Sequence, residues 1–99
     1  MRYNVEFLKK AEDEYLQVIE YLSQFYESTP QKFYNEFEKY KRMLEENPYS
    51  FQVCEYAPEY RRAIVMDYLV FYKVNDKTRL VEIHRIFHSS RNINQILEQ

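Results

Sequence analysis

The side chains best suited to chemistry are basic, and they gather in the second half of the chain. Residues 60–99 hold seven Lys or Arg against four Asp or Glu, whereas residues 1–59 hold seven against twelve, which together give the net charge of −2. Cations beside a histidine suit contact with phosphate groups, and a histidine or carboxylate there could act as a general acid or base. The candidates are Arg61, Arg62, Lys73, Arg85, His88 and Arg91, with Glu55 as an additional base. The alternative is that these charges are solvated at strand edges.

His88 is the residue with the widest choice of roles. Its unperturbed pKa lies near neutrality, so it could act as a general acid or a general base. It could equally end the last strand by hydrogen-bonding the backbone, or form part of a binding surface. The sequence leaves these interpretations open.

Two arginines are predicted to converge. Arg62 and Arg85 are expected on neighbouring strands, where their guanidinium groups could contact a phosphate or an acidic partner. The alternative is cross-strand pairing with Glu82 or Asp67. His84 should point to the face opposite Arg85, where it would be packed or exposed.

The remaining reactive side chains carry weaker signals. Aromatic faces could stack on unpaired bases, but core packing explains most of the 11 tyrosines, with Tyr68 and Tyr72 as the best exceptions. Cys54 has no histidine at a recognisable spacing and is expected to be inert. One Cys and two His are too few for a zinc cluster, so we expect no metal and no cofactor.

The composition describes one domain spanning residues 1–99. With 45% hydrophobic and 30% charged residues, the chain can bury one core and is neither disordered nor membrane-like. No apolar run is long enough to span a bilayer, and the N-terminus lacks the apolar region of a signal peptide. A lone cysteine makes no intramolecular disulfide, so a cytoplasmic location is expected.

Hydrophobic spacing divides the chain into two halves. Residues 3–7 alternate apolar and polar, which predicts a short strand, and residues 8–46 carry two apolar stripes with helical spacing. Ser28, Thr29 and Pro30 end the first helix and begin the second. Ser28 with Gln31 fits a capping box, and Thr29 is an equally good cap. The second helix should end near Asn47, before Pro48.

The second half is rich in β-formers. After a loop over residues 49–59, strands are expected at residues 63–65, 68–72 and 80–87. Met66-Asp67 should form one turn and residues 75–78 the other, with Asn and Asp supplying unusual backbone angles because the chain has no glycine. The fold class is therefore α+β: a helical hairpin on a small antiparallel sheet, in the order β-α-α-β-β-β, with a short C-terminal helix. The first strand could join at the centre or at an edge.

Two stretches resemble a known superfamily. Tyr60 to Val74 (YRRAIVMDYLVFYKV) is similar to the central hairpin of RelE/ParE toxins, and Val81 to Asn92 (VEIHRIFHSSRN) is similar to their last strand. The first strand, Ala11 in the first helix, and the Asn47-Pro48 pair agree as well. The resemblance covers nearly the whole chain.

The resemblance implies a small cytoplasmic toxin that is neutralised by a cognate antitoxin. RelE-like members cleave mRNA on the ribosome without a metal, and ParE-like members inhibit DNA gyrase. It would make Arg62, Arg85 and His88 catalytic in a nuclease. In either branch, the resemblance implies that basic residues contact the target or the antitoxin, namely Arg61, Arg62, Lys73, Arg85 and Arg91.

Three departures favour the ParE-like branch. Leu69 stands where many nuclease members carry an arginine, and the chain ends Ile96-Leu97-Glu98-Gln99 without their catalytic Tyr or His-Tyr. A pI of about 5.7 is low for a protein that docks on ribosomal RNA. Gyrase inhibition is therefore slightly favoured over mRNA cleavage, and an inactive antitoxin-binding homologue is the third alternative.

Overall fold

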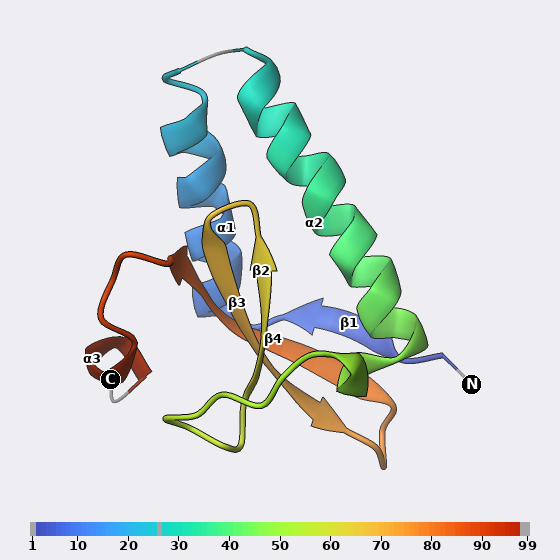
Figure 1. The fold of residues 1–99 in the computed structure, drawn as a ribbon. Helices are drawn as coiled ribbons and strands as arrows, with labels where there is room; N and C mark the ends of the chain where they lie inside the picture. The colour runs from blue at the N-terminus through green and yellow to red at the C-terminus, as the bar shows by residue number, and fades with distance from the viewer. Residues whose placement is uncertain (1, 26, 98–99) are drawn as a thin grey trace.

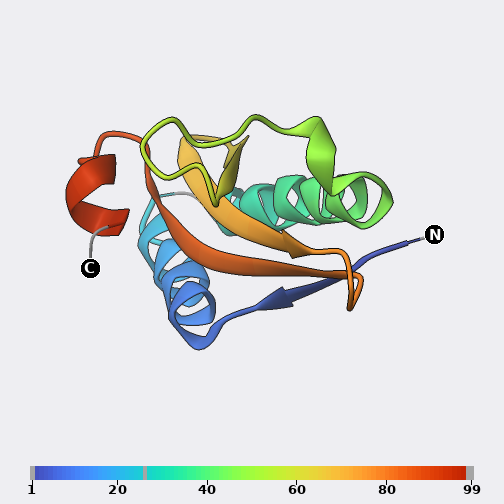
Figure 2. The same cartoon turned by 90° about the horizontal axis from the view of Figure 1, so that it is seen from below.

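The helices and strands follow one another in the predicted order. A computed structural model describes residues 2–25 and 27–97, so Glu98 and Gln99 lie outside the described residues. The elements are β1 (Asn4–Phe7), α1 (Lys9–Leu22), α2 (Ser28–Glu46), the 3-10 turn η1 (Pro48–Ser50), β2 (Arg61–Val65), β3 (Tyr68–Asn75), β4 (Leu80–His88) and α3 (Ile93–Leu97). The α+β class and the short C-terminal helix are confirmed, with α3 at the end of the molecule away from α2 (Figures 1 and 2).

The helical hairpin buries the apolar stripes that its sequence predicts. Ala11 and Val18 of α1 and Phe33 and Phe37 of α2 are buried in a core shared with one face of the sheet. The predicted capping box is wrong. No side chain caps α2, and Gln31 instead donates to Asn35 at 2.9 Å.

The sheet has the strand order β1-β4-β3-β2, which places β1 at an edge. β1 runs parallel to β4, with Val5 opposite Val81, while the β2–β3 and β3–β4 pairs are antiparallel. The sheet is therefore mixed. The predicted meander is confirmed for β2 to β4. The two helices connect β1 to β2 at the opposite edge of the sheet, and β4 then runs alongside β1 in the same direction.

A β-bulge interrupts β4 and changes which way its side chains point. Phe71 pairs with Arg85 but Tyr72 pairs with Ile83, so His84 is an extra residue in β4. A bulge places two residues opposite one and breaks the strict alternation of faces. His84 and Arg85 consequently line the same small cavity of about 200 Å³. The prediction that they face opposite sides is wrong.

Both hairpin turns are made without glycine. Met66 and Asp67 form the predicted turn, in which Met66 has a φ of 56°. In the second turn Asn75 accepts bonds from the amides of Lys77 and Thr78, but Arg79 takes the left-handed conformation, with a φ of 52°. The expectation that Asn or Asp would supply the unusual backbone angle there is wrong.

The two faces of the sheet carry separate apolar clusters. One packs under α1 and α2, and the other joins Leu69, Phe71 and Phe87 to Cys54 of the loop and Ile96 of α3. Buried Cys54 thus belongs to the packing of the second face. Within the described residues, no helix has the length and hydropathy that crossing a bilayer requires.

Candidate functional site: a groove between α1 and the end of β4

A groove of about 500 Å³ lies between α1 and the C-terminal end of β4. Tyr21 of α1, Tyr68 of β3 and Ile86 of β4 supply apolar surface, and His88 and Arg91 supply polar groups. We call it the His88 groove. A concave, largely apolar surface with a few convergent polar groups is typical of a binding site.

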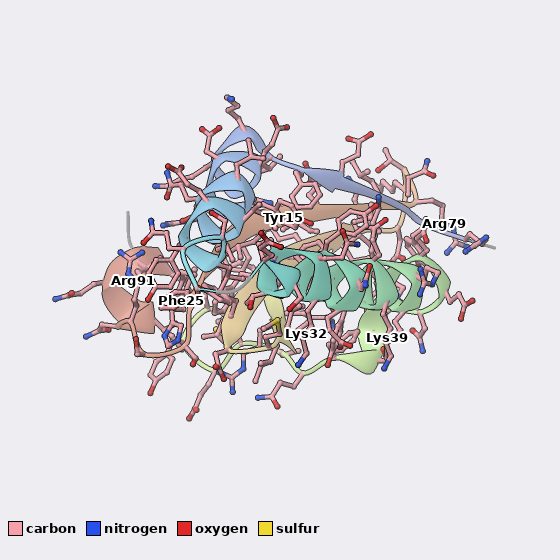
Figure 3. All side chains as sticks on the ribbon, turned by 90° about the horizontal axis from the view of Figure 1, so that it is seen from above. Tyr15, Phe25, Lys32, Lys39, Arg79 and Arg91 are labelled. Atoms are coloured by element: carbon pink, nitrogen blue, oxygen red, sulfur yellow. The ribbon has the colours of Figure 1, made fainter. Side chains whose placement is uncertain are left out.

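An aromatic ridge extends the groove at the C-terminal end of α1 and into the turn that follows it. The Tyr21 and Phe25 rings meet edge to face with centroids 5.1 Å apart, and more than half of each residue is exposed. Figure 3 shows Phe25 and Arg91 at the same end of the molecule. Exposed aromatics beside a groove are common at protein–protein contacts.

His88 sits half-buried at the end of β4. Its Nδ1 accepts a bond of 3.1 Å from the amide of Ser90 and lies 2.8 Å from the Ser90 hydroxyl, and its ring meets Tyr68 edge to face. The expectation that His88 bonds the backbone at the strand end is confirmed. Because Nδ1 accepts from an amide, the neutral ring carries its proton on Nε2.

Arg85 is held by a residue that the sequence analysis missed. Its Nη2 lies 3.0 Å from Oε2 of Glu14 in α1, its Nε lies 3.2 Å from both carboxylate oxygens, and its Nη1 donates to the carbonyl of Ile96 at 2.9 Å. The side chains of Arg85 and Glu14 are only 11% and 13% exposed. Pairing of Arg85 with Glu82 or Asp67 is therefore wrong.

Glu14 also closes the free edge of β4. β1 ends at Phe7, opposite Ile83, so β4 has no strand partner on that side beyond this point. There the amide of Ile86 donates to Oε1 of Glu14 at 2.9 Å. The apolar stripe of α1 includes Ala11 and Val18, and a carboxylate at position 14 within this stripe is the signal that could have identified Glu14.

Arg62 and Arg85 are not on neighbouring strands. Arg62 pairs with Phe71 of β3, which in turn pairs with Arg85, so β3 lies between them. Two strand spacings amount to about 9.6 Å. Arg62 Nη2 instead lies 2.8 Å from the Gln52 side-chain amide, whose oxygen can accept from it.

The other predicted cations are dispersed. Arg61 donates to the carbonyl of Phe51 at 2.7 Å and lies over the Tyr49 ring, and Lys73 lies over the Tyr60 ring. Among the predicted catalytic and basic residues that the structure describes, His88 and Arg91 alone line the His88 groove. Glu55 is exposed in the loop before β2.

The two tyrosines singled out from the sequence differ. Tyr68 lines the His88 groove. Tyr72 is fully buried, and its hydroxyl donates to the carbonyl of Pro48 at 2.6 Å. Burial raises the pKa of Tyr72 well above its ordinary value of 10. Tyr72 is thus a core residue.

His84 lies on the face of the sheet that carries α3, where it lines a small cavity together with Arg85 and Ile96. Its ring packs edge to face on Tyr60, so of the two expectations, packed or exposed, the first is confirmed. Its Nε2 is buried without a partner among the described residues. Burial, followed by the nearby Lys73 ammonium, lowers the pKa of His84 below its ordinary 6.5. Within the residues that the structure describes, no three His, Cys, Asp or Glu side chains come together to hold a metal ion.

Several solved structures contain a chain with a fold similar to this one. A chain of the archaeal RelE–RelB complex from Pyrococcus horikoshii is 24% identical with a TM-score of 0.65, and the match covers 93% of this chain and 100% of that one. A chain of the RelBE2 toxin–antitoxin complex from Mycobacterium tuberculosis is 18% identical with a TM-score of 0.66, covering 89% and 99%. A chain of the intact Escherichia coli RelBE complex is 15% identical with a TM-score of 0.63, covering 90% and 99%. At these identities the likeness is one of fold.

The sequence itself supplies the family. No curated protein matches this chain. The model of the family described as the ParE toxin of the type II toxin–antitoxin system parDE matches residues 5–93, which is most of the chain. The protein belongs to the ParE toxin family of type II toxin–antitoxin systems.

Proposed function

We propose that this protein arrests bacterial growth by binding and inhibiting DNA gyrase, and that a cognate antitoxin neutralises it in the cytoplasm. One observation carries the choice of target. The cations that RNA cleavage would require do not converge, because Arg85 is neutralised by Glu14 and Arg62 lies two strands away. The His88 groove with its aromatic ridge is instead a surface for binding another protein.

The similar solved complexes support the antitoxin partner. Each of the three contains a chain of this fold and is described as a RelE–RelB or toxin–antitoxin complex. The exposed Tyr21 and Phe25 would bury apolar surface on being covered by a partner.

Cleavage of mRNA is the second candidate, and one feature favours it. His88 and Arg91 share a groove with two tyrosines, and no hydrogen bond engages the His88 Nε2 among the described residues. A histidine and an arginine beside stacking surfaces are components of a metal-free nuclease.

Induction of the chain alone in bacteria distinguishes these functions. We expect growth arrest with filamentation and a DNA-damage response, relief by the antitoxin, and loss of supercoiling by purified gyrase. Tyr21→Ala and Arg91→Ala should each weaken gyrase inhibition about tenfold. Arg42→Ala, which removes an exposed cation from α2, is the matched control and should not.

Other outcomes would point elsewhere. Rapid cutting of translated mRNA, abolished by His88→Ala while gyrase stays active, would replace gyrase inhibition with the nuclease function. If folded protein caused no arrest but still bound the antitoxin, the chain would be an inactive binding homologue.

A further inference from the structure

A small cavity lies beside α3, apart from the His88 groove. Side chains from the start of α1, from β4 and from α3 line it together with Tyr60, and no described residue lines both cavities. We call it the α3 cavity. Its volume is about 200 Å³. Because one water takes up about 30 Å³ of the liquid, the α3 cavity has room for about seven non-hydrogen atoms.

The β-bulge brings two nitrogen-bearing side chains to this cavity. His84 is the extra residue of β4, and Arg85 follows it. The Nε2 of His84 is buried, and no described residue forms a hydrogen bond with it. Buried polar atoms are nearly always paired, because an unpaired one has lost its bond to water. A ligand that bonds to this atom would recover the lost free energy.

Arg85 also has donors that its structural contacts do not use. A guanidinium group presents five N–H donors. The bonds to Glu14 and to the carbonyl of Ile96 engage three of them, namely the one on Nε and one on each of Nη1 and Nη2. The other two have no acceptor within residues 2–25 and 27–97. Such donors suit a carboxylate.

The charges around the α3 cavity favour an anion. Lys10 lines it from α1, and Lys73 lies over the Tyr60 ring, 4.7 Å from the ring centroid. Burial lowers the pKa of His84 most, Lys73 lowers it further, and Glu82 opposes them with the smallest effect. The excess of cations therefore selects an occupant with a single negative charge.

The rest of the lining is apolar. Leu8 at the start of α1 and Ile96 and Leu97 of α3 supply aliphatic surface. Water can satisfy the polar atoms of a cavity, but it gains nothing from apolar walls. A molecule with one charged end and a short hydrocarbon tail matches both sides.

We propose that the α3 cavity binds a small aliphatic carboxylate of about four to six carbon atoms. Its carboxylate accepts hydrogen bonds from the Nε2 of His84 and from Arg85, and lies near Lys10. Its tail packs against Leu8 and Ile96. The ligand thus contacts α1, β4 and α3 at once. The inference does not depend on which macromolecule the toxin inhibits.

Titration of the full chain with sodium pentanoate, followed by NMR, tests the site. We expect saturable binding with a Kd on the order of 1 mM, since a ligand of about seven atoms has limited binding energy. The shifts should centre on His84, Arg85 and Ile96, with contacts between the ligand tail and the Ile96 methyl groups. Acetate, 1-pentanol and pentylammonium, which lack the tail, the charge or its sign, should each bind about tenfold more weakly or not at all.

The histidine ring signals give a second readout. A carboxylate beside Nε2 favours the charged imidazolium, so saturating pentanoate should raise the pKa of His84. The pKa of His88, which lies in the other groove, should not change.

Two variants and a control test the lining. His84→Phe keeps a ring against Tyr60 but removes Nε2, and should weaken pentanoate binding about tenfold. Lys10→Gln should weaken it about threefold, and Lys77→Gln, which removes an exposed cation from the β3–β4 turn, should leave it unchanged. Spectra and melting curves of each variant would show that the fold is intact.

Four results would overturn the proposal. These are no saturable binding at about 20 mM pentanoate, equal affinity for 1-pentanol, unchanged affinity in folded His84→Phe, and shifts that centre on the His88 groove. The first would leave the α3 cavity filled by water alone.

Discussion

At the scale of single side chains, Glu14 joins three parts of the molecule. Its carboxylate binds the Arg85 guanidinium and the amide of Ile86, and Arg85 in turn binds the carbonyl of Ile96. Two charges that are nearly removed from water are stable only as a pair. The contact therefore fixes α1, β4 and α3 relative to one another.

Replacing Glu14 tests this pairing. Glu14→Gln retains the shape and one acceptor but leaves the Arg85 charge buried and unpaired. We expect the free energy of unfolding to fall by about 3 kcal/mol, measured by urea denaturation. Glu20→Gln, at an exposed position of the same helix, should change it by less than about 0.5 kcal/mol.

A double variant separates pairing from general damage. If the Glu14–Arg85 contact is the cause, Glu14→Gln combined with Arg85→Met should cost much less than the sum of the single changes. Additive costs would contradict it.

At the scale of elements, the β2–β3 hairpin contains a strained residue. Met66 is held at a φ of 56°, where its Cβ crowds the neighbouring carbonyl oxygen. Glycine has no Cβ and adopts this conformation freely. The strands on either side compensate for the strain because they bury Val65 and Tyr68.

Met66→Gly should therefore stabilise the protein. We expect a gain of about 0.5–1 kcal/mol after the greater freedom of glycine in the unfolded chain is counted. Calorimetry should show a melting temperature higher by a few degrees. Asp67→Gly is the control, because Asp67 has no positive φ and the substitution there should lower the melting temperature.

The elements also show where sequence patterns suffice. The helical stripes and the Met66-Asp67 turn were predictable because each is set by residues close together in the chain. The bulge at His84 and the parallel pairing of β1 depend on partners far away in sequence. Period-two alternation assumes a regular strand, so it misplaced His84 relative to Arg85.

The candidate site was less predictable for the same reason. Types and spacing identified His88, Arg91 and Tyr68, but the groove also needs Glu14 and Tyr21 from the other half of the chain. The charge asymmetry suggested one basic patch. The structure instead uses Arg61 and Arg85 to bind backbone carbonyls and a buried carboxylate.

At the scale of the whole molecule, Asp76 fastens three segments. Asp76 lies in the β3–β4 turn. Its carboxylate accepts hydrogen bonds from the hydroxyl of Tyr3, which precedes β1, and from the hydroxyl of Tyr49 in η1. These bonds lower the pKa of Asp76 below its ordinary 3.8 and raise the pKa of Tyr49 to about 12.

The sign of the pH dependence follows from this shift. A carboxyl group whose pKa is lower in the folded state stabilises the protein at pH values above its unfolded-state pKa. This stabilisation is lost as the pH falls through its folded-state pKa. Asp76→Asn should thus be less stable than wild type at pH 7, with the difference shrinking below about pH 3.8. Glu46→Gln, at the exposed end of α2, should show no such convergence in parallel denaturation curves.

The position of β4 between β1 and β3 has a consequence for the newly made chain. A ribosome completes α1, α2 and the strands β1, β2 and β3 before it makes β4. In the folded sheet β4 lies between β1 and β3. Until residues 80–88 have emerged, β1 has no strand partner, and the His88 groove lacks the residues that β4 contributes to its lining. The protein therefore acquires the strand that joins β1 to β3, and with it the His88 groove, only late in its own synthesis.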